Sequence, residues 1–199
     1  MFEVRVHGRG GQGVVTAAEM LSVAAFREGR HAQAFPSFGS ERTGAPVIAF
    51  CRIADREIRL REPVTEPDCL IVQDPTLFKV VDVFAGLKPK GFLIVNTHKS
   101  FAELEIEEVA RRLPPGHAVT VPASDIARRH VGRPLPNAAL LGAFAALTEL
   151  VRFESVRHAI EEAFPGRIGA VNIAAAEEAH VHVVATEHAA GVGDHAATL

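Results

Sequence analysis

Three glycines near the N-terminus have a spacing that suits the binding of a phosphate. Gly8, Gly10 and Gly13 fit the pattern G-x-G-x-x-G, between an alternating apolar stretch at residues 2–6 and an alanine-rich run. Such a turn bends without Cβ clashes, lets backbone N–H groups approach a phosphate, and packs a helix tightly on a strand. Many α/β turns use glycine only to bend. Two interpretations therefore stay open: a phosphate site, or glycines that serve packing alone.

A dinucleotide site of the dehydrogenase type needs a further residue that this chain lacks. It calls for a carboxylate about 20 residues beyond the glycines, at the end of the second strand, to bind the adenosine ribose. Here the second predicted strand, 31–35, is followed by Pro36 and Ser37, with neither a carboxylate nor a basic residue for a 2′-phosphate. No Gly-Lys-Ser/Thr follows the turn, which excludes a P-loop. The phosphate hypothesis therefore concerns another phosphate, with Arg9 and Arg42 as charge partners.

The histidines and cysteines form no metal-ligand pattern. His180 and His182 are two residues apart, which places them on different faces of a helix, and His7 beside the glycines is typical of a core or turn histidine. Cys51 and Cys69 are the only cysteines, and each lies in an apolar, strand-like stretch. Because two distant cysteines match no zinc or iron–sulfur spacing, we expect buried thiols and no metal site.

Candidate nucleophiles and acid–base residues are present but isolated. Ser37 and Ser40 lie in no Gly-x-Ser-x-Gly elbow and have no identifiable base. Glu41 and Asp74 have the chemistry of an acid or base, but an Asp before proline is typical of a helix cap or turn, and Glu41 can pair with Arg42. We therefore expect no catalytic set on this chain, which favours a binding subunit.

Composition narrows the class of protein further. A length of 199 residues suits one α/β domain with a full core, and 48% apolar residues exclude wholesale disorder. The net charge of −3 argues against a nucleic-acid-binding domain, which normally has a basic excess. Because the first predicted strand begins at residue 2 and no apolar run reaches membrane-spanning length, we expect no signal peptide, no membrane span and a cytoplasmic protein.

The elements that would position these residues alternate between strand and helix. Apolar alternation and buried-type apolar runs predict strands at 2–6, 31–35, 47–53, 57–60, 69–73, 91–96 and 117–121. Helical periodicity predicts helices at 13–28, 76–83, 106–113, 125–130, 137–151, 155–164 and 171–184. Three side chains are candidate helix caps: Ser124 or Asp125 before the fourth helix and Ser155 at the sixth. The helix at 137–151 is almost uncharged, which places it in the core or at a subunit interface.

This order predicts an α/β fold with an open, largely parallel, Rossmann-like sheet, flanking helices and a β-hairpin insertion. We expect the hairpin to join 47–53 to 57–60 around residues 54–56. In such sheets ligands bind outside the carboxyl ends of the strands, so the glycine turn, the 37–44 loop, Asp74 and Asn96 would share one rim. The domain would span 1–185, and 186–199 would form a tail that is flexible or contacts a partner.

Several of these segments resemble one protein family. Residues 8–13, Gly-Arg-Gly-Gly-Gln-Gly before an alanine-rich helix, are similar to the opening of the gamma subunit of 2-oxoacid:ferredoxin/acceptor oxidoreductases, the pyruvate/ketoisovalerate oxidoreductase gamma family. The loop 36–44 resembles its second hallmark, Gly-x-Glu-x-Arg-Gly or Gly-x-Glu-Arg-Arg-Gly, although Thr43 and Ala45 depart from it. Asn96, Asn172 and the stretches 122–127 and 136–143 match further, so the resemblance covers about residues 1–185.

The resemblance implies a subunit of a complex that oxidatively decarboxylates a 2-oxoacid to an acyl-CoA. Alpha and beta subunits would bind thiamine diphosphate, and a ferredoxin-like subunit would carry iron–sulfur clusters. Electrons would pass to ferredoxin or, through a flavoprotein, to NAD. The oxoacid is left open, because relatives with this resemblance handle several.

The resemblance also implies a place for coenzyme A (CoA). The glycine turn would help to hold CoA near the thiamine site, with backbone N–H groups of residues 10–13 and Arg9 against its phosphates. Ser37, Glu41 and Arg42 would shape the same rim or the contact with a catalytic subunit. The expected cofactor-binding residues are Gly8, Arg9, Gly10, Gly11, Gln12, Gly13, Ser37, Glu41, Arg42 and Asn96. Two alternatives remain: a purely structural assembly subunit without a ligand, and an independent Rossmann-type nucleotide-binding protein.

Overall fold

A computed structural model describes residues 1–37 and 43–196, with side chains described up to residue 186. Its strands are β1 (Phe2–Arg9), β2 (His31–Pro36), β3 (Pro46–Ala54), β4 (Cys69–Val72), β5 (Phe92–Asn96) and β6 (Ala118–Val121). Its helices are α1 (Val14–Arg27), α2 (Glu107–Arg112), α3 (Ala123–Val131), α4 (Asn137–Thr148), α5 (Phe153–Ala163) and α6 (Arg167–Ala196), with a 3-10 helix, η1 (Pro75–Lys79).

The strands form one sheet in the order β2-β3-β1-β4-β5-β6. The pairs β1–β4, β4–β5 and β5–β6 are parallel, whereas β3 runs antiparallel to both of its neighbours, β1 and β2. Long apolar runs in β4 and β5 explain the parallel half, since a strand buried on both faces needs apolar side chains at every position. The predicted open, largely parallel α/β sheet is confirmed.

The hairpin has a different partner from the predicted one. β3 pairs with β2 across the loop that contains residues 37–45, from His31 opposite Ala54 to Pro36 opposite Ala49. Residues 57–60 form no strand, although Glu-Ile-Arg-Leu alternates like one. The physical reason is that β1 and β2 already occupy both edges of β3, which leaves no free edge for a fourth strand.

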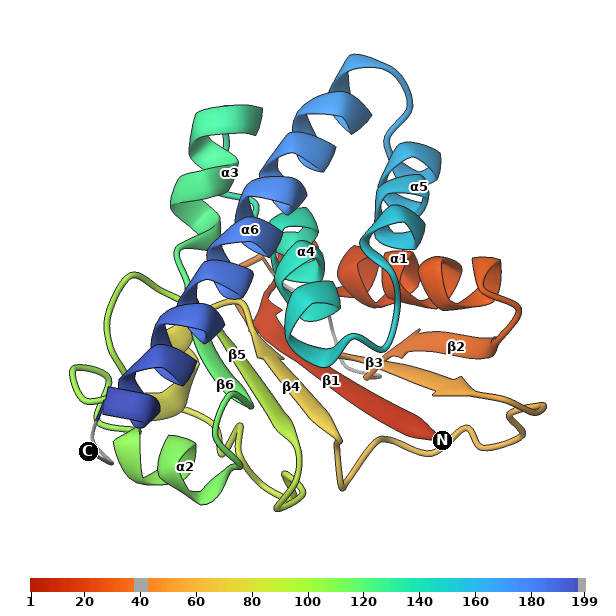
Figure 1. The fold of residues 1–199 in the computed structure, drawn as a ribbon. Coiled ribbons are helices and arrows are strands. Elements are labelled where there is room, and N and C mark those ends of the chain that lie inside the picture. The colour runs from red at the N-terminus through yellow and green to blue at the C-terminus, as the bar shows by residue number, and fades with distance from the viewer. Residues whose placement is uncertain (38–42, 197–199) are drawn as a thin grey trace.

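Helices cover the two faces of the sheet unequally. Figure 1 shows α1, α4, α5 and α6 together over one face, with α2 beside the other. Alternate residues of the strands supply both cores: Val4, Val6 and Ile71 pack with the large helical layer, while Leu70 and Val72 pack with the smaller cluster around α2 and η1. No helix in the described part of the chain is long and apolar enough to cross a membrane.

α4 lies in the centre of the helical layer, as its uncharged sequence predicts. Residues 138–147 are all buried, and α4 packs closely along α6. A Cβ atom on Gly142 would lie only 1.9 Å from the carbonyl oxygen of Ala176, so the two helix backbones meet at this glycine. The contact explains why a residue with poor helix propensity occupies the middle of a core helix.

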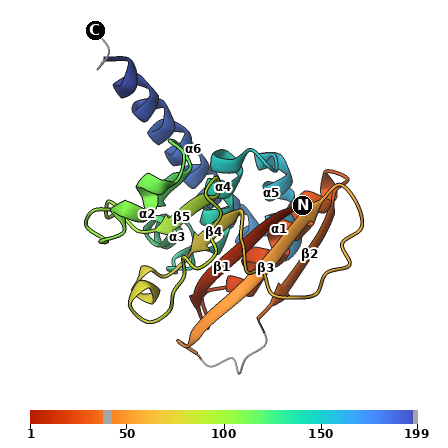
Figure 2. The ribbon, with the colours of Figure 1, turned by 90° about the horizontal axis from the view of Figure 1, so that it is seen from below.

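Helix ends are where the structure departs most from the predicted bounds. α3 begins at Ala123, and neither Ser124 nor Asp125 caps it; Ser155 likewise lies inside the first turn of α5 and is buried. The segment predicted as a helix at 76–83 is the shorter η1, with Asp74 as its cap. α6 continues to Ala196, beyond the predicted end at 184, and its C-terminal end projects from the rest of the chain (Figure 2).

Two buried arginines fasten irregular segments to the face of the sheet opposite α1. Arg5 donates to the carbonyls of Val83 and Ala85 at 2.9 and 2.6 Å, and burial lowers its pKa despite the nearby charge of Asp82. Arg52 pairs with Glu3 at 2.8 Å and donates to the carbonyl of Glu62. These charge-assisted hydrogen bonds hold loop backbone where no regular ladder exists.

Candidate functional site

The glycine turn lies at the carboxyl end of β1, beside the start of β3. Gly10 donates to the carbonyl of Ala45 at 2.9 Å and accepts from the N–H of Gly44 at 3.1 Å, so the turn and the end of the 37–45 loop are tied together. Gln73 and Asp74, directly after the neighbouring strand β4, lie on the same rim. The predicted meeting of the glycine turn with Asp74 and Asn96 is confirmed, and so is that of the turn with Gly44 at the end of the 37–44 loop. Residues 38–42 of this loop lie outside the described residues.

This rim is also where the direction of chain progression across the sheet changes. From β1 the chain leads to β2 and β3 on one side, and β4, β5 and β6 follow on the other. In open α/β sheets, ligands bind in the crevice outside the strand ends at such a switch point. Here the switch point lies between the ends of β1 and β4. The cavity beside it is lined by residues that follow β4, β5 and β6 and by Gln12 of the glycine turn.

Three glycines in and around the turn, Gly8, Gly11 and Gly13, are required for two different reasons. A Cβ on Gly8 would lie 2.6 Å from Val14 Cγ2, so this glycine permits α1 to pack on β1. Gly11 has φ +92° and open space around it, while Gly13 has φ +72° and lies against Asn137, whose Nδ2 would be 2.6 Å from a Cβ. Gly11 and Gly13 therefore shape the turn, since side chains rarely adopt positive φ.

The N-terminus of α1 opens onto the rim without a side-chain cap. Gly13 is the capping residue, no side chain caps the helix, and its first turn has no acidic residue. Among the described residues, no hydrogen bond of the Gly11 or Gly13 N–H group is present. Free amides at a helix start attract anions, because the helix dipole adds to their own polarity.

Arg9 is engaged within the protein and does not extend into the crevice. Its Nε donates to Asp74 at 3.0 Å, Nη1 to the carbonyl of Gly44 at 3.0 Å, and Nη2 to the hydroxyl of Thr76 at 2.8 Å. Gln12 strengthens the arrangement, since its Oε1 accepts from the Arg9 N–H and its Nε2 donates to Asp74. In this arrangement the guanidinium fixes the turn to η1.

Asp74 is the carboxylate on which this network converges. Burial alone would raise its pKa, but hydrogen bonds from the hydroxyl and amide of Thr76 and from Gln12, with the charge of Arg9, hold its pKa below the usual range. Asp74 therefore stays ionised near neutral pH. The interpretation of Asp74 as a helix cap is confirmed, and its pairing with Arg9 is an addition.

Asn96 joins the ends of β4 and β5 to the start of α3. Its Nδ2 donates to the carbonyl of Gln73 at 2.7 Å and to Ser124 Oγ at 2.8 Å, while its Oδ1 accepts from the Ser124 N–H. Because both polar atoms of its side chain are hydrogen-bonded within the protein, Asn96 is a positioning residue. Ser37 is exposed beside the loop, and its N–H donates to Ile48. Glu41 and Arg42 lie outside the described residues.

His7 and the cysteines are buried away from the crevice. His7 is 2% exposed, and burial, with a smaller contribution from the charge of Arg5, lowers its pKa to about 3. Burial raises the thiol pKa of Cys51 and Cys69, the latter with help from Asp68. Within the described residues no three His, Cys, Asp or Glu side chains gather as metal ligands.

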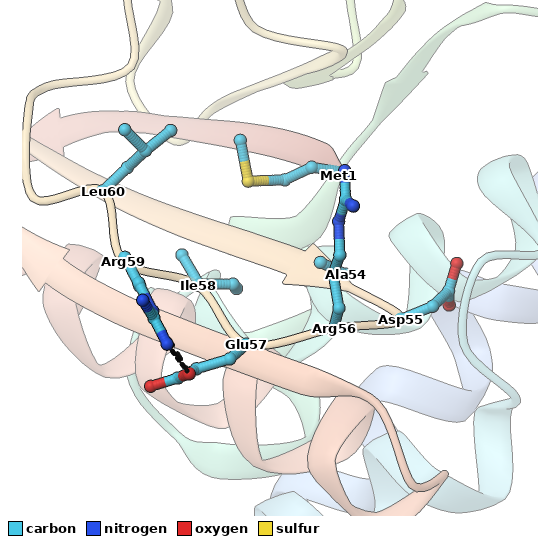
Figure 3. Close-up of a pocket in the computed structure, with 8 residues that line it drawn as sticks. All are labelled: Met1, Ala54, Asp55, Arg56, Glu57, Ile58, Arg59 and Leu60. Atoms are coloured by element: carbon cyan, nitrogen blue, oxygen red, sulfur yellow. Dashed lines mark hydrogen bonds and ion pairs between the residues drawn. The ribbon is translucent and has the colours of Figure 1, made fainter.

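A cavity of 570 Å³ at the opposite end of the sheet has no comparable chemistry. It is lined by Met1 and residues 54–60, beside the end of β3 (Figure 3). Its ionic pair, Arg59 with Glu57, is exposed, and such pairs contribute little. The cavity at the rim is smaller, 320 Å³, but Gln73, Asp74, Asn96 and Ser124 line it.

Comparison with known proteins identifies the family. The model of the family described as "Pyruvate ferredoxin/flavodoxin oxidoreductase" matches residues 3–181. The chain belongs to this family. The resemblance seen in the glycine turn and the loop motifs is thereby confirmed.

Relatives within the pyruvate ferredoxin/flavodoxin oxidoreductase family match over nearly the whole chain. The common subunit gamma of pyruvate/ketoisovalerate oxidoreductases from Thermococcus kodakarensis is 51% identical, covering 94% of this chain and 100% of the relative. Subunit PorC of pyruvate synthase from Methanothermobacter marburgensis is 49% identical, covering 90% and 96%. The crystal structure of pyruvate oxidoreductase subunit PORC from Thermotoga maritima aligns with TM-score 0.74 and 36% identity, covering 90% and 94%.

The sheet of this family member also bears on the dehydrogenase alternative. In a dinucleotide-binding fold the ribose carboxylate ends a parallel strand beside the first strand. Here the strand in that position, β3, is antiparallel to β1 and therefore ends at the opposite edge of the sheet. The geometry agrees with the missing carboxylate and disfavours NAD or NADP.

Two side chains beside the turn, Gln73 and Asn137, were not among the predicted site residues. Gln73 was predicted only as the end of a strand, and Asn137 as the start of a helix within a stretch that resembles the family, yet both are buried at the rim. A polar residue directly after a buried parallel strand was the available signal for Gln73. Asn137 lies in the stretch 136–143 that resembles the family, but its contact with Gly13 was not predictable, because it comes from an element far along the chain.

Proposed function

We propose that this chain is the gamma subunit of a complex that oxidatively decarboxylates a 2-oxoacid to an acyl-CoA. Partner subunits would hold thiamine diphosphate and iron–sulfur clusters and pass electrons to ferredoxin or, through a flavoprotein, to NAD. This chain would bind CoA and help the complex to assemble in the cytoplasm. Family membership and the subunit names of relatives that match almost the whole chain support the proposal.

The observation that carries the CoA assignment is the uncapped, exposed turn at the switch point between β1 and β4. Gly11 is exposed, α1 begins without a side-chain cap, and the turn is rigidly tied to β3 and η1. A rigid set of free amides at a helix start suits the pyrophosphate of CoA. In this proposal the amides of Gly11, Gly13 and Val14 contact phosphate, while Arg9, Gln12 and Asn96 hold the turn in place. The N–H groups of Gly10 and Gln12, expected to contact phosphate as well, are instead donated to the carbonyls of Ala45 and Arg9.

Reconstitution tests the proposal directly. Candidate thiamine-binding and iron–sulfur subunits from the same organism would be purified with and without this chain. The 2-oxoacid-dependent reduction of a viologen dye would then be measured against CoA concentration. We expect this chain to copurify and the CoA-dependent rate to fall by about tenfold or more without it, since a CoA contact would be lost. Unchanged CoA dependence without the chain would contradict the proposal.

The same experiment separates the structural alternative. A purely structural assembly subunit would change the yield or the oligomeric state of the complex but leave the Michaelis constant for CoA unchanged. A CoA-binding subunit would change that constant in the complex that still assembles. The two functions therefore predict different readouts from one preparation.

A further inference from the structure

Gln73 is a buried amide side chain without a hydrogen-bond partner. It is 1% exposed, and within the described part of the chain neither its Nε2 nor its Oε1 has a partner. Its backbone is fixed, because its N–H donates to the carbonyl of His7 at 2.7 Å and its carbonyl accepts from Asn96. Buried polar groups are nearly always satisfied by protein, water or ligand. An apolar side chain would suit the core better unless something binds this amide.

The side chain of Gln73 faces the crevice. It lines the 320 Å³ cavity together with Gln12, Asn96 and Ser124. Its Oε1 would be 3.1 Å from a Cβ on Gly8, so it lies directly against the glycine turn. The side-chain amide of Gln12 is hydrogen-bonded to Arg9 and Asp74, and that of Asn96 is hydrogen-bonded to Ser124. Gln73 is therefore the amide side chain in this wall whose polar atoms are unpaired.

The charges around the cavity disfavour an anion at this point. Asp74 and Asp125 line it, and the residues described as its lining include no lysine or arginine; their cationic partners, Arg9 and Arg128, stand outside the lining. The imidazole of His98 lies 4.0 Å from Asp125. A phosphate would meet carboxylate oxygens here, whereas an uncharged amide would not.

We propose that Gln73 binds the uncharged, amide-bearing pantetheine arm of CoA, with the phosphates at the neighbouring glycine turn. The inference rests on the proposed function and adds an orientation to it. Nε2 of Gln73 donates to an amide carbonyl of the arm, and Oε1 accepts from an amide N–H. A secondary amide offers both groups, which a phosphate or carboxylate does not.

Two fragments of CoA test this assignment on the assembled complex. Pantetheine carries the amides without the nucleotide, and adenosine 3′,5′-bisphosphate carries phosphates without the amides. Their dissociation constants would be measured by calorimetry for the parent and for Gln73→Met, which keeps side-chain length but removes both polar atoms. We expect Gln73→Met to raise the dissociation constant of pantetheine by about tenfold or more, because the contacts to its amides are lost. The dissociation constant of the bisphosphate should stay within about twofold of the parent value.

A matched control separates recognition from general effects of removing a buried amide. Gln33 on β2 also has a buried, unpartnered Oε1, but it lies on the edge strand away from the crevice. Gln33→Met should leave the dissociation constants of pantetheine and of the bisphosphate unchanged. In the parent chain, labelled with ¹⁵N, the side-chain NH₂ signals of Gln73 should shift with pantetheine and not with the bisphosphate, which gives a readout that needs no variant.

Three results would overturn the inference. Pantetheine does not bind, its affinity is unchanged in Gln73→Met, or Gln73→Met lowers the affinity for pantetheine and for the bisphosphate equally. If CoA still binds to the complex, these results remove only the role of Gln73 and leave the proposed function standing. If CoA itself does not bind, the proposed function fails together with the inference.

Discussion

Arg9 and Gln73 show how burial and pairing decide what a rim residue does. The guanidinium of Arg9 makes three hydrogen bonds to neighbouring segments. Its charge is paired with Asp74, and its other bonds hold the backbone at Gly44 and the hydroxyl of Thr76. Gln73 carries no charge, yet it is the side chain whose polar atoms are left unpaired in the cavity wall. A residue at this rim is thus a candidate ligand contact when its polar atoms have no hydrogen-bond partner in the protein, and a positioning residue when they do.

The buried His7 predicts a dependence of stability on pH. Its folded-state pKa is lowered to about 3, while the unfolded value is about 6.5, so the unfolded chain binds the extra proton between these pH values. Stability is therefore lost as pH falls below about 6.5, by roughly 2 kcal/mol at pH 5 for this residue. Urea unfolding followed by circular dichroism measures it, since the chain lacks Trp and Tyr as fluorophores.

His7→Leu is the matched variant, because it removes the titrating ring and leaves every carboxylate in place. Its free energy of unfolding should fall by about 2 kcal/mol less than that of the parent between pH 7 and pH 5. Equal losses in the two proteins would mean that His7 is solvated or paired in solution.

Sequence reasoning at the residue scale succeeded where the cause is local. The glycine pattern predicted a tight turn that includes Gly13, which has a positive φ, and Asp74 before Pro75 is a local cap. The positive φ of Gly11 is an addition from the structure. Asn137 behind Gly13 and Ser124 beside Asn96 were not predictable as contacts, because each pair joins elements far apart in the sequence. The binding roles assigned to the rim residues remain predictions.

At the scale of elements, the close crossing of α4 and α6 makes Gly142 a sensitive position. In an exposed helix Gly→Ala stabilises by roughly 0.5–1 kcal/mol, but here the new Cβ would lie 1.9 Å from the backbone oxygen of Ala176. The helices must separate, so we expect Gly142→Ala to destabilise the chain by about 2 kcal/mol or more. Denaturant unfolding of the full chain measures the change.

The control for this crossing is Ala170→Gly, at an exposed position of α6. It carries only the helix-propensity penalty of roughly 1 kcal/mol. A Gly142→Ala variant that proved as stable as the parent would show that α4 and α6 do not meet as closely as described.

Elements were predictable in kind but less so in their partners and ends. Apolar runs sufficed for β4, β5 and α4, because burial on all sides leaves a continuous pattern. The hairpin was assigned to the wrong segment because alternation at 57–60 shows a pattern without showing whether a sheet edge is free. The predicted caps of α3 and α5 were wrong, because Ser124 and Ser155 lie inside these helices and not before them.

At the scale of the whole molecule, the inserted strand β3 makes this sheet different from a dinucleotide-binding one. It separates β2 from β1, and the residues just before it, Gly44 and Ala45, are hydrogen-bonded to Gly10 of the glycine turn. The switch point of the sheet lies between β1 and β4. The fold class was predictable because strands and helices alternate along the chain. The antiparallel position of β3 was not, since it depends on long-range pairing.

The affinity of the assembled complex for CoA in two matched glycine variants tests the central claim most directly. Gly11 and Gly29 are both exposed, both have positive φ (+92° and +77°), and a Cβ on either would meet nothing within 4 Å. Leucine at either position carries a similar backbone strain of about 1–2 kcal/mol, but only Gly11→Leu adds a side chain to the glycine turn before α1. We predict that Gly11→Leu raises the dissociation constant of CoA by about tenfold or more, because it blocks the amides, while Gly29→Leu leaves it unchanged. Equal CoA affinity in the two variants would contradict the account.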